Sequence, residues 1–336
     1  MCPFMHHKVK RLNKAAKKWG LRFGAYQVVA LGGSFPSEGW NGKRIYSQCY
    51  MRVNSPFFCK KTWDFRIRGY SKMEDYTEFI DVAQKAADIS RKTLNLHREN
   101  YLYGHFDFET KEDASPVTEI DRKVEQQIRE VIQEMCPTHG ILGEEYGTDS
   151  KDQEFVWVID PIDGTKQFIA GIPVYGTLIA LCHHGVPVLG VIDIPAVKER
   201  WLGIKGQQTT LNGRKVSTRA RKKLSEALMS SSNTEPVLPE HRLGYEKMIE
   251  TTKWRVYGSA CYAYACLASG KLDVSIDSGG MREVDYCALV PIIEGAGGVI
   301  TDWAGDPLTI HSGTTVVAAG DADLHAQTLA ILSQYL

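Results

Sequence analysis

The sequence predicts a fold of the α/β (α+β) class, built from layered sheets and helices. Three observations predict it: amphipathic helical spacing over about 75–97 and 120–135, an apolar strand over 155–159, and a strand hairpin between 175 and 192. Because helices and strands are mixed and several strands are hairpin-paired, sheets covered by helices are the expected architecture.

The overall composition is that of an ordinary globular protein. The chain has 336 residues, of which 43% are hydrophobic and 24% charged, and its formal net charge is zero. A net charge of zero argues against nucleic acid as a partner. There is no run of about 18 apolar residues, which excludes a membrane-spanning helix. The eight cysteines include no C-x-x-C pair and form no zinc signature.

Residues 1–72 form a basic leader that differs from the rest of the chain. They contain 15 Lys and Arg but only two acids, Glu38 and Asp64. Acid-poor basic leaders are typical of transit peptides, so we expect a plastid or mitochondrial protein if the segment is one, and a cytoplasmic protein otherwise. Residues 8–19 have the spacing of a basic amphipathic helix. A nucleic-acid-binding or membrane-binding arm, or an extension without a partner, is the alternative.

Residues 73–336 are expected to form the folded part, with sub-lobes that meet near residue 205. Its two N-terminal helices are predicted from apolar residues at helical spacing, such as Val82 and Ala86 in the first and Val124 and Ile128 in the second. The second helix begins with Thr118-Glu-Ile-Asp121, which has the pattern of a capping box.

The central part of the sequence predicts several β-strands. Phe155 to Ile159 is a continuous apolar run with β-branched residues, which is typical of a buried strand. Residues 175–181 and 186–192 flank His183-His184-Gly185, a pattern that predicts a hairpin with a polar turn. We therefore expect His183 and His184 to be solvent-facing turn residues rather than metal ligands.

The C-terminal part alternates short strands and helices. We expect strands at 225–230, 254–257, 272–276, 299–301 and 314–319, and helices at 261–268, 285–294 and 322–332.

Acidic residues gather at three structural junctions. They are Glu144-Glu145 after a short apolar segment, Asp160 and Asp163 after the buried strand, and Asp285 where a helix begins. No His or Cys accompanies them, so the metal donors are hard oxygens, which suit Mg²⁺ completed by a substrate phosphate.

The segment Asp160-Pro-Ile-Asp-Gly-Thr165 combines two kinds of binding group. Pro161 stiffens the turn between the two carboxylates, and Gly164 allows the backbone to approach a ligand closely. Thr165 then begins a helix predicted over 165–169, whose first amides are unpaired within the helix and can bind phosphate oxygens.

Each acidic cluster also has an ordinary structural explanation. Asp285 and Asp121 fit helix capping, Asp160 and Asp163 fit common turn chemistry, and Glu144 with its neighbour fits a solvated pair. The complete central string together with the upstream Glu144 and the downstream Asp285 favours a metal site over coincidence.

These motifs resemble the inositol monophosphatase superfamily of Mg²⁺-dependent phosphatases over nearly all of residues 75–336. Within it, the flanking runs are most similar to histidinol-phosphate phosphatases of the bacterial and plant type. The resemblance implies a layered αβαβα sandwich of the inositol monophosphatase and sugar phosphatase type, assembled as a homodimer. The runs that carry it are Ser115 to Arg122, Trp157 to Ile169, Tyr175 to Leu181, Val188 to Asp193, Cys261 to Tyr264 and Asp285 to Trp303.

The resemblance also assigns roles to individual residues. Glu144 would help to hold the attacking water, while Thr165 and Asp121 orient it. Phosphate would bind the amides of Asp163, Gly164 and Thr165, and water would attack directly, without a phosphoenzyme. The ligands of two or three Mg²⁺ would be Glu144, Asp160, the Ile162 carbonyl, Asp163 and Asp285.

The chain departs from the histidinol-phosphate pattern at two places near the expected substrate. Ala260 stands before the Cys-Tyr-Ala-Tyr run, where that branch usually has an acid and inositol-type members have Ala. Asp277 stands eight residues before Asp285, where an acid some seven before is usual. Asp277 and Arg282 are our candidates for contacting the leaving group, and the loss of one carboxylate would weaken recognition of an amine-bearing substrate.

Three functions follow from these observations. The leading one is a histidinol-phosphate phosphatase of histidine biosynthesis. The second is an inositol-1-monophosphatase or a broader sugar or nucleotide monophosphatase. The third is a phosphate-binding interaction protein whose basic leader holds RNA, which the intact ligand set disfavours because unneeded buried carboxylates are costly.

Overall fold

The computed structural model describes residues 75–100, 109–110, 116–149, 152–221, 223–231 and 237–335. Residues 72–336 form one compact unit. The basic leader, with the helix expected at 8–19, lies outside the described residues, as does Ser115 of the first motif. Within the described residues, no helix has both the length and the apolar character needed to cross a bilayer.

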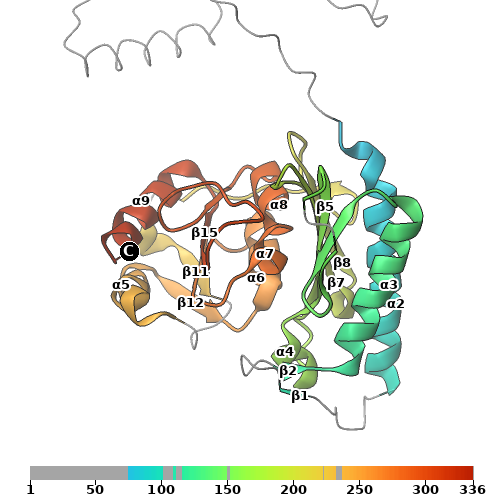
Figure 1. The fold of residues 1–336 in the computed structure, drawn as a ribbon. Coiled ribbons are helices and arrows are strands. Elements are labelled where there is room, and N and C mark those ends of the chain that lie inside the picture. Colours follow the sequence, from blue (N-terminus) through green and yellow to red (C-terminus); the bar gives the residue numbers. More distant parts are fainter. Residues whose placement is uncertain are drawn as a thin grey trace, which may run out of the picture. The chain divides into compact units, whose positions relative to one another are not determined.

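Five layers alternate between helices and sheets, which confirms the expected sandwich (Figure 1). One pair of helices covers the outer face of the first sheet, a second pair lies between the sheets, and a third covers the outer face of the second sheet. The pairs are α2 (Ile80–Asn100) with α3 (Glu119–Met135), α6 (Ala260–Ala268) with α8 (Leu289–Gly295), and α5 (Arg242–Thr251) with α9 (Ala322–Leu332).

The first sheet has eight strands in the order β10-β9-β8-β7-β6-β5-β3-β4. All neighbours are antiparallel except β3 and β5, which are parallel. The strands are β3 (Gly140–Gly143), β4 (Gly147–Asp149), β5 (Phe155–Asp163), β6 (Gly176–His183), β7 (Val186–Ile194), β8 (Glu199–Ile204), β9 (Thr210–Leu211) and β10 (Arg214–Lys215).

The second sheet has five strands in the order β12-β11-β13-β15-β14. Its strands are β11 (Leu228–Ser231), β12 (Trp254–Tyr257), β13 (Val274–Ser278), β14 (Val299–Thr301) and β15 (Thr315–Ala319). The remaining elements are β1 (Glu109–Thr110), β2 (Pro116–Val117), α4 (Thr165–Ile169), α7 (Glu283–Tyr286) and the 3-10 turns η1 (Thr77–Phe79), η2 (Pro195–Val197), η3 (Leu224–Glu226), η4 (Pro239–His241) and η5 (Ser333–Tyr335).

Three apolar clusters fill the spaces between the layers, the one around α6 and α8 reaching both sheets, and each cluster contains one fully buried tryptophan. Trp157 lies between the α2–α3 pair and the first sheet, Trp201 between the two sheets, and Trp303 between the second sheet and the outer helices. Every residue of β6 is buried because helices cover both faces of this strand. At Gly190 of β7 an added Cβ would overlap the Ala288 carbonyl, so glycine permits α8 to lie close to the sheet.

Several expected elements need correction. The helix expected over 285–294 is two short helices, α7 and α8, and the strand expected over 225–230 begins as the 3-10 turn η3 before β11. Strand β8 and helix α5 were not expected from the sequence. The first sheet continues past residue 205 through β9 and β10.

His183 is a further correction. It was expected to face solvent, but its side chain is 9% exposed, because β6 continues through this residue. Its neighbour His184 is exposed in the turn, as expected.

Candidate active site

The carboxylates of the central motif lie on an irregular stretch of β5. Asp160 pairs with Leu178 of β6, but Asp163 pairs with Gly176, so three residues on one strand oppose two on the other. Side chains three apart on a regular strand point to opposite faces, and a bulge re-aims them. The amide of Ile162 donates to Asp160 Oδ1 at 3.0 Å, which holds the turn around Pro161.

Three carboxylates converge at this bulge. One oxygen each of Asp160, Asp163 and Asp285 lies within 4.8 Å of the others. Asp160 is 2% exposed, and the other two are partly buried. Asp285 comes from α7, between the sheets, and is held by the amide of Arg282, which donates to it at 2.6 Å.

The electrostatics of this cluster disfavour charge in the absence of a cation. Burial raises the pKa of Asp160 well above its usual range, and the nearby charges of Glu144, Asp163 and Asp285 raise it further. Burial, then Asp163 and Glu144, likewise raise the pKa of Asp285 well above normal. Like charges held together in a buried site need a counter-cation. Since every donor is a hard oxygen, the set fits Mg²⁺ rather than Zn²⁺.

Glu144 is brought to the same place from the loop after β3. Its amide donates to the Ile159 carbonyl at 3.1 Å, which ties the loop to β5. Its Oε1 accepts from Arg282 Nη2 at 2.9 Å. The structure therefore places Arg282, a predicted substrate contact, beside Glu144, a predicted metal ligand.

A buried ion pair on α3 supports this loop, and the sequence reasoning missed it. Glu125 is fully buried and accepts from Arg129 Nε at 2.7 Å. It also accepts from the amides of Glu145 at 2.6 Å and Tyr146 at 3.2 Å. In the sequence, an acid and an arginine four residues apart on a helix look like an exposed ion pair. The one signal that could have indicated their burial is that both lie next to the apolar stripe of the helix.

The predicted phosphate-binding turn has the expected conformation. Gly164 has φ 84°, in the left-handed region, and its position would bring an added Cβ to 3.0 Å from the Ala260 side chain. Helix α4 begins at Thr165, as predicted, and the Thr165 hydroxyl donates to the Ile162 carbonyl at 3.0 Å. Two of the predicted groups, Thr165 and the Ile162 carbonyl, are thus in direct contact.

Asp121 is placed in the first turn of α3. The Thr118 amide donates to its carboxylate at 2.8 Å and the Thr118 hydroxyl donates to it as well, which confirms the capping box. β2, which directly precedes Thr118, packs against α4. The helix that begins with Thr165 therefore contacts the strand that leads into the helix of Asp121.

The remaining predicted substrate residues lie deeper. Ala260 is 4% exposed and has φ 46°, an unusual backbone conformation for alanine. It directly precedes Cys261, whose amide donates to the Asp163 carboxylate. Asp277 is also buried and accepts from Tyr264 Oη at 2.6 Å and from Ser231 Oγ at 3.2 Å. Burial and the charge of Asp277 raise the pKa of Tyr264, which keeps this phenol neutral and donating.

Comparison with known proteins agrees with this geometry. The chain is 44% identical over 260 residues to a bifunctional phosphatase, IMPL2, described as chloroplastic, from Arabidopsis thaliana, covering 75% of this chain and 74% of that protein. It is 34% identical over 241 residues to a histidinol-phosphatase of Chlorobaculum parvum, covering 71% of this chain and 92% of that one.

The solved structures give the same picture. An inositol monophosphatase from Zymomonas mobilis superposes with a TM-score of 0.70 at 35% identity, covering 77% of this chain and 99% of that chain. The model of the inositol monophosphatase family matches residues 73–336. Fold, acidic cluster and sequence therefore agree, and the chain belongs to the inositol monophosphatase family of phosphatases.

Proposed function

We propose that this phosphatase is an Mg²⁺-dependent histidinol-phosphate phosphatase that acts by direct attack of water. The observation that carries the proposal is the convergence of Asp160, Asp163 and Asp285 beside the Gly164–Thr165 turn. A phosphate monoester is a dianion that hydrolyses extremely slowly without catalysis, so such a site must neutralise phosphoryl charge strongly.

The four carboxylates and the Ile162 carbonyl would hold two or three Mg²⁺. Bound there, Mg²⁺ supplies Lewis-acid neutralisation of the phosphoryl oxygens, activation of water and stabilisation of the leaving oxygen. The bulge at Pro161 gives Asp160 and Asp163 a common direction, while the Arg282 amide orients Asp285. Arg282 Nη2 occupies Glu144 Oε1 in the described structure, so we expect this pair to rearrange when the metal binds.

The phosphate and the attacking water would be handled by the α4 turn. The amides of Asp163, Gly164 and Thr165 would donate hydrogen bonds to phosphate oxygens. The Thr165 hydroxyl donates its proton to the Ile162 carbonyl, so its lone pairs remain available to accept a hydrogen bond from water. Asp121, held by Thr118, would accept the water's proton, with Glu144 completing its orientation.

The substrate assignment rests on relatives named histidinol-phosphatase, from Chlorobaculum parvum, Mycobacterium tuberculosis and Streptomyces coelicolor, at 34, 34 and 31% identity. Of the three proposed substrate residues, Arg282 is exposed beside Glu144, whereas Ala260 and Asp277 are buried. We therefore assign direct contact with the leaving group to Arg282, and shaping of the pocket wall to Ala260 and Asp277.

An inositol phosphate is the second candidate substrate, and Ala260 favours it. An acid at this position would attract the amine of histidinol, whereas alanine gives no such attraction. The Zymomonas mobilis structure and a probable inositol 1-monophosphatase of Mycobacterium tuberculosis, at 35% identity each, are relatives of this second kind.

The experiment that decides is a comparison of kcat/KM for the two substrates. The full chain is assayed for phosphate release with Mg²⁺ on L-histidinol phosphate and on inositol 1-phosphate, with Asp160→Asn as the control. We expect histidinol phosphate to be preferred at least about tenfold, a difference near 1.4 kcal/mol. A preference for inositol phosphate would overturn the substrate assignment. Inactivity on both, with no Mg²⁺ bound, would favour the phosphate-binding protein.

We further propose that residues 1–72 direct the protein to a plastid or mitochondrion and that it assembles as a homodimer. The basic, acid-poor leader supports targeting, and the Arabidopsis relative's name places that protein in the chloroplast. Fusion of residues 1–72 to a fluorescent protein tests the first proposal by microscopy. Sedimentation velocity of the full chain tests the second, and a monomer would contradict it.

A further inference from the structure

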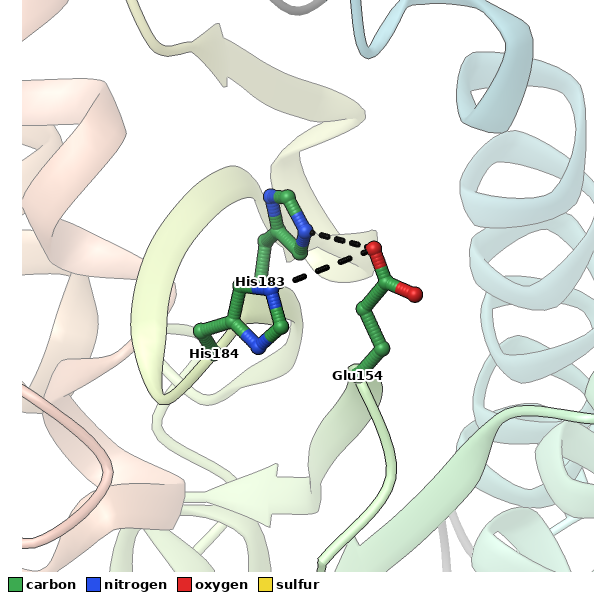
Figure 2. A group of neighbouring side chains, drawn as sticks. All are labelled: Glu154, His183 and His184. Carbon is green, nitrogen blue, oxygen red and sulfur yellow. Dashed lines mark hydrogen bonds and ion pairs between the residues drawn. The ribbon is translucent and has the colours of Figure 1, made fainter.

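A second group of metal-ligating side chains lies at the other end of β5 from the acidic cluster. Glu154 directly precedes β5, His183 ends β6, and His184 follows in the turn to β7 (Figure 2). One ligand atom from each lies within 4.8 Å of the others. His183 Nε2 is 3.0 Å from Glu154 Oε1, and His184 Nε2 is 3.9 Å from the same oxygen. Six residues of extended chain separate Glu154 from Asp160, which is about 20 Å.

The backbone brings the two rings to one side. Consecutive residues on a strand point to opposite faces, so two adjacent histidines would normally diverge. Here His184 and Gly185 have φ 50° and 78° and form a two-residue turn, with His183 paired to Val186 across it. These angles are typical of a type I′ turn, in which Asn, Asp or Gly is favoured at the first position. The rings of His183 and His184 are stacked, with their centroids 4.4 Å apart. The backbone amide of His184 donates to the Glu154 carbonyl at 2.8 Å.

The ring of His183 is held in one orientation. It stacks on Phe155 at 4.4 Å with an interplanar angle of 10°, and its Nδ1 lies 3.0 Å from the hydroxyl of the buried Tyr76. Nε2 is thereby directed toward Glu154. A histidine that binds metal through one nitrogen usually has its other nitrogen fixed by a hydrogen-bond partner. The Tyr76 hydroxyl is able to accept from Nδ1–H in that state.

We propose that Glu154, His183 and His184 bind one Zn²⁺ ion. Two imidazoles and a carboxylate are the donor set that Zn²⁺ takes, and a water completes the tetrahedron. Bonds of about 2.0 Å require ligand atoms about 3.3 Å apart. The His183–Glu154 pair is near this spacing already, and the exposed His184 and Glu154 side chains, 72% and 62% accessible, are open to rotation and to an entering ion.

Such an ion would act on the fold rather than on the reaction. It would join the start of β5 to the β6–β7 turn and, through Tyr76, to the segment that begins the described chain. It would take imidazole ligands, which the all-oxygen cluster at the far end of β5 does not offer. The inference is independent of the substrate proposed above.

The test is binding of Zn²⁺ to the full chain, first stripped with a chelator and then held in millimolar Mg²⁺ to fill the acidic cluster. Isothermal titration calorimetry gives affinity and stoichiometry, and Co²⁺ substituted for Zn²⁺ gives a visible spectrum of a tetrahedral site. His184→Asn removes one imidazole while keeping a residue that favours the turn. We expect it to remove one equivalent of tight Zn²⁺ and to weaken binding at least about 100-fold, and Tyr76→Phe to weaken it about tenfold.

The matched control is the double variant His6→Asn and His7→Asn, which removes a second adjacent histidine pair from the leader. This variant should keep the tight site, and Glu154→Gln, chosen in case the histidine variant folds poorly, should lose it. Loss of the tight equivalent in the leader variant alone would overturn the proposal. So would wild-type protein that takes up no Zn²⁺, since the three side chains would then make only polar contacts with one another.

Discussion

Two groups of acids in the described part of the chain differ in how their charge is balanced. Asp193 accepts from Arg91 Nε at 3.0 Å and from Arg200 Nε at 2.5 Å, and Asp273 accepts from Arg219 Nε at 2.6 Å. Asp160, Asp163 and Asp285 instead face one another. Among the residues that the structure describes, the acidic cluster has one ion pair, between Arg282 and Glu144.

The difference appears in the pKa values. Burial alone would raise the pKa of Asp273, but hydrogen bonds from Arg219 and the Leu228 amide hold it below the usual range. Burial raises the pKa of Asp160 and Asp285 well above that range, and the neighbouring carboxylates add to the effect. The charges of the first group are balanced by arginines of the chain, whereas the carboxylates of the second group face one another and are suited to balancing by a bound cation.

The largest effect on activity is expected when a carboxylate of the second group is replaced. Asp160→Asn keeps the volume of the side chain but removes a charge that holds the cation, so several kcal/mol of transition-state stabilisation disappear. We expect kcat to fall by roughly 10³-fold or more, with the circular dichroism spectrum unchanged. Retained activity in this variant would remove Asp160 from the mechanism.

Breaking the first group should affect stability instead. Asp193→Asn leaves Arg91 and Arg200 facing a neutral amide, and loss of one partner from a buried pair costs about 3 kcal/mol. Urea denaturation should show this loss, while the Mg²⁺ concentration needed for half activity stays within about twofold of the wild-type value. A large change in that concentration would mean that the two groups are coupled.

Glu125 sharpens the comparison because it belongs to the first group but supports the second. Glu125→Gln weakens the hold on the amides of Glu145 and Tyr146 and hence the placement of Glu144. Because Glu125 acts by positioning Glu144, the substitution should raise the Mg²⁺ concentration needed for half activity about tenfold, while kcat at saturating Mg²⁺ is nearly preserved. The control is Gln126→Ala, an exposed neighbour on α3, and an equal fall of kcat at every Mg²⁺ concentration would argue against positioning.

The smallest effect is expected for Asp285→Asn in the metal-free chain, where the substitution should stabilise the fold rather than destabilise it. The pKa of Asp285 is higher in the folded than in the unfolded chain, so its stabilising contribution is present below about pH 4 and is lost as the pH rises through the folded value. At pH 7 the variant should therefore be more stable than wild type by about 1 kcal/mol in EDTA. Its advantage should vanish at acid pH, and Mg²⁺ should no longer raise its melting temperature. A less stable variant at pH 7 would refute this account.

Much of the fold could be predicted because its helices and central strands have clear apolar periodicity. The αβαβα layers came from the family resemblance, and β5, β6 and α3 lie close to their expected ranges. β8 was missed because it begins with Glu199 and Arg200, and charged residues at its start hide an otherwise buried strand. Arg200 is there to pair with Asp193, a tertiary reason that local pattern does not contain.

The candidate site was predictable to the extent that its residues lie in one short motif. The sequence indicates a shared site because four of its residues lie close together in one motif: Asp160, Asp163, Gly164 and Thr165. The role of Glu125, by contrast, depends on a loop about twenty residues later, and its short-range partner Arg129 makes it look like an exposed helical pair. The exposure of His183 was predicted wrongly because His183-His184-Gly185 looked like a three-residue turn. The turn has only two residues, His184 and Gly185, so His183 still belongs to the strand.

The contact between Glu144 and Arg282 joins residues 138 positions apart, and Asp285 arrives with the same segment. During synthesis, a chain that has produced only the eight-stranded sheet already carries Glu144, Asp160 and Asp163 but lacks the fourth acid. Magnesium at cellular concentrations would then find an incomplete binding set and dissociate readily. Catalytic competence would thus be acquired late, only after the helices between the sheets have emerged from the ribosome and docked.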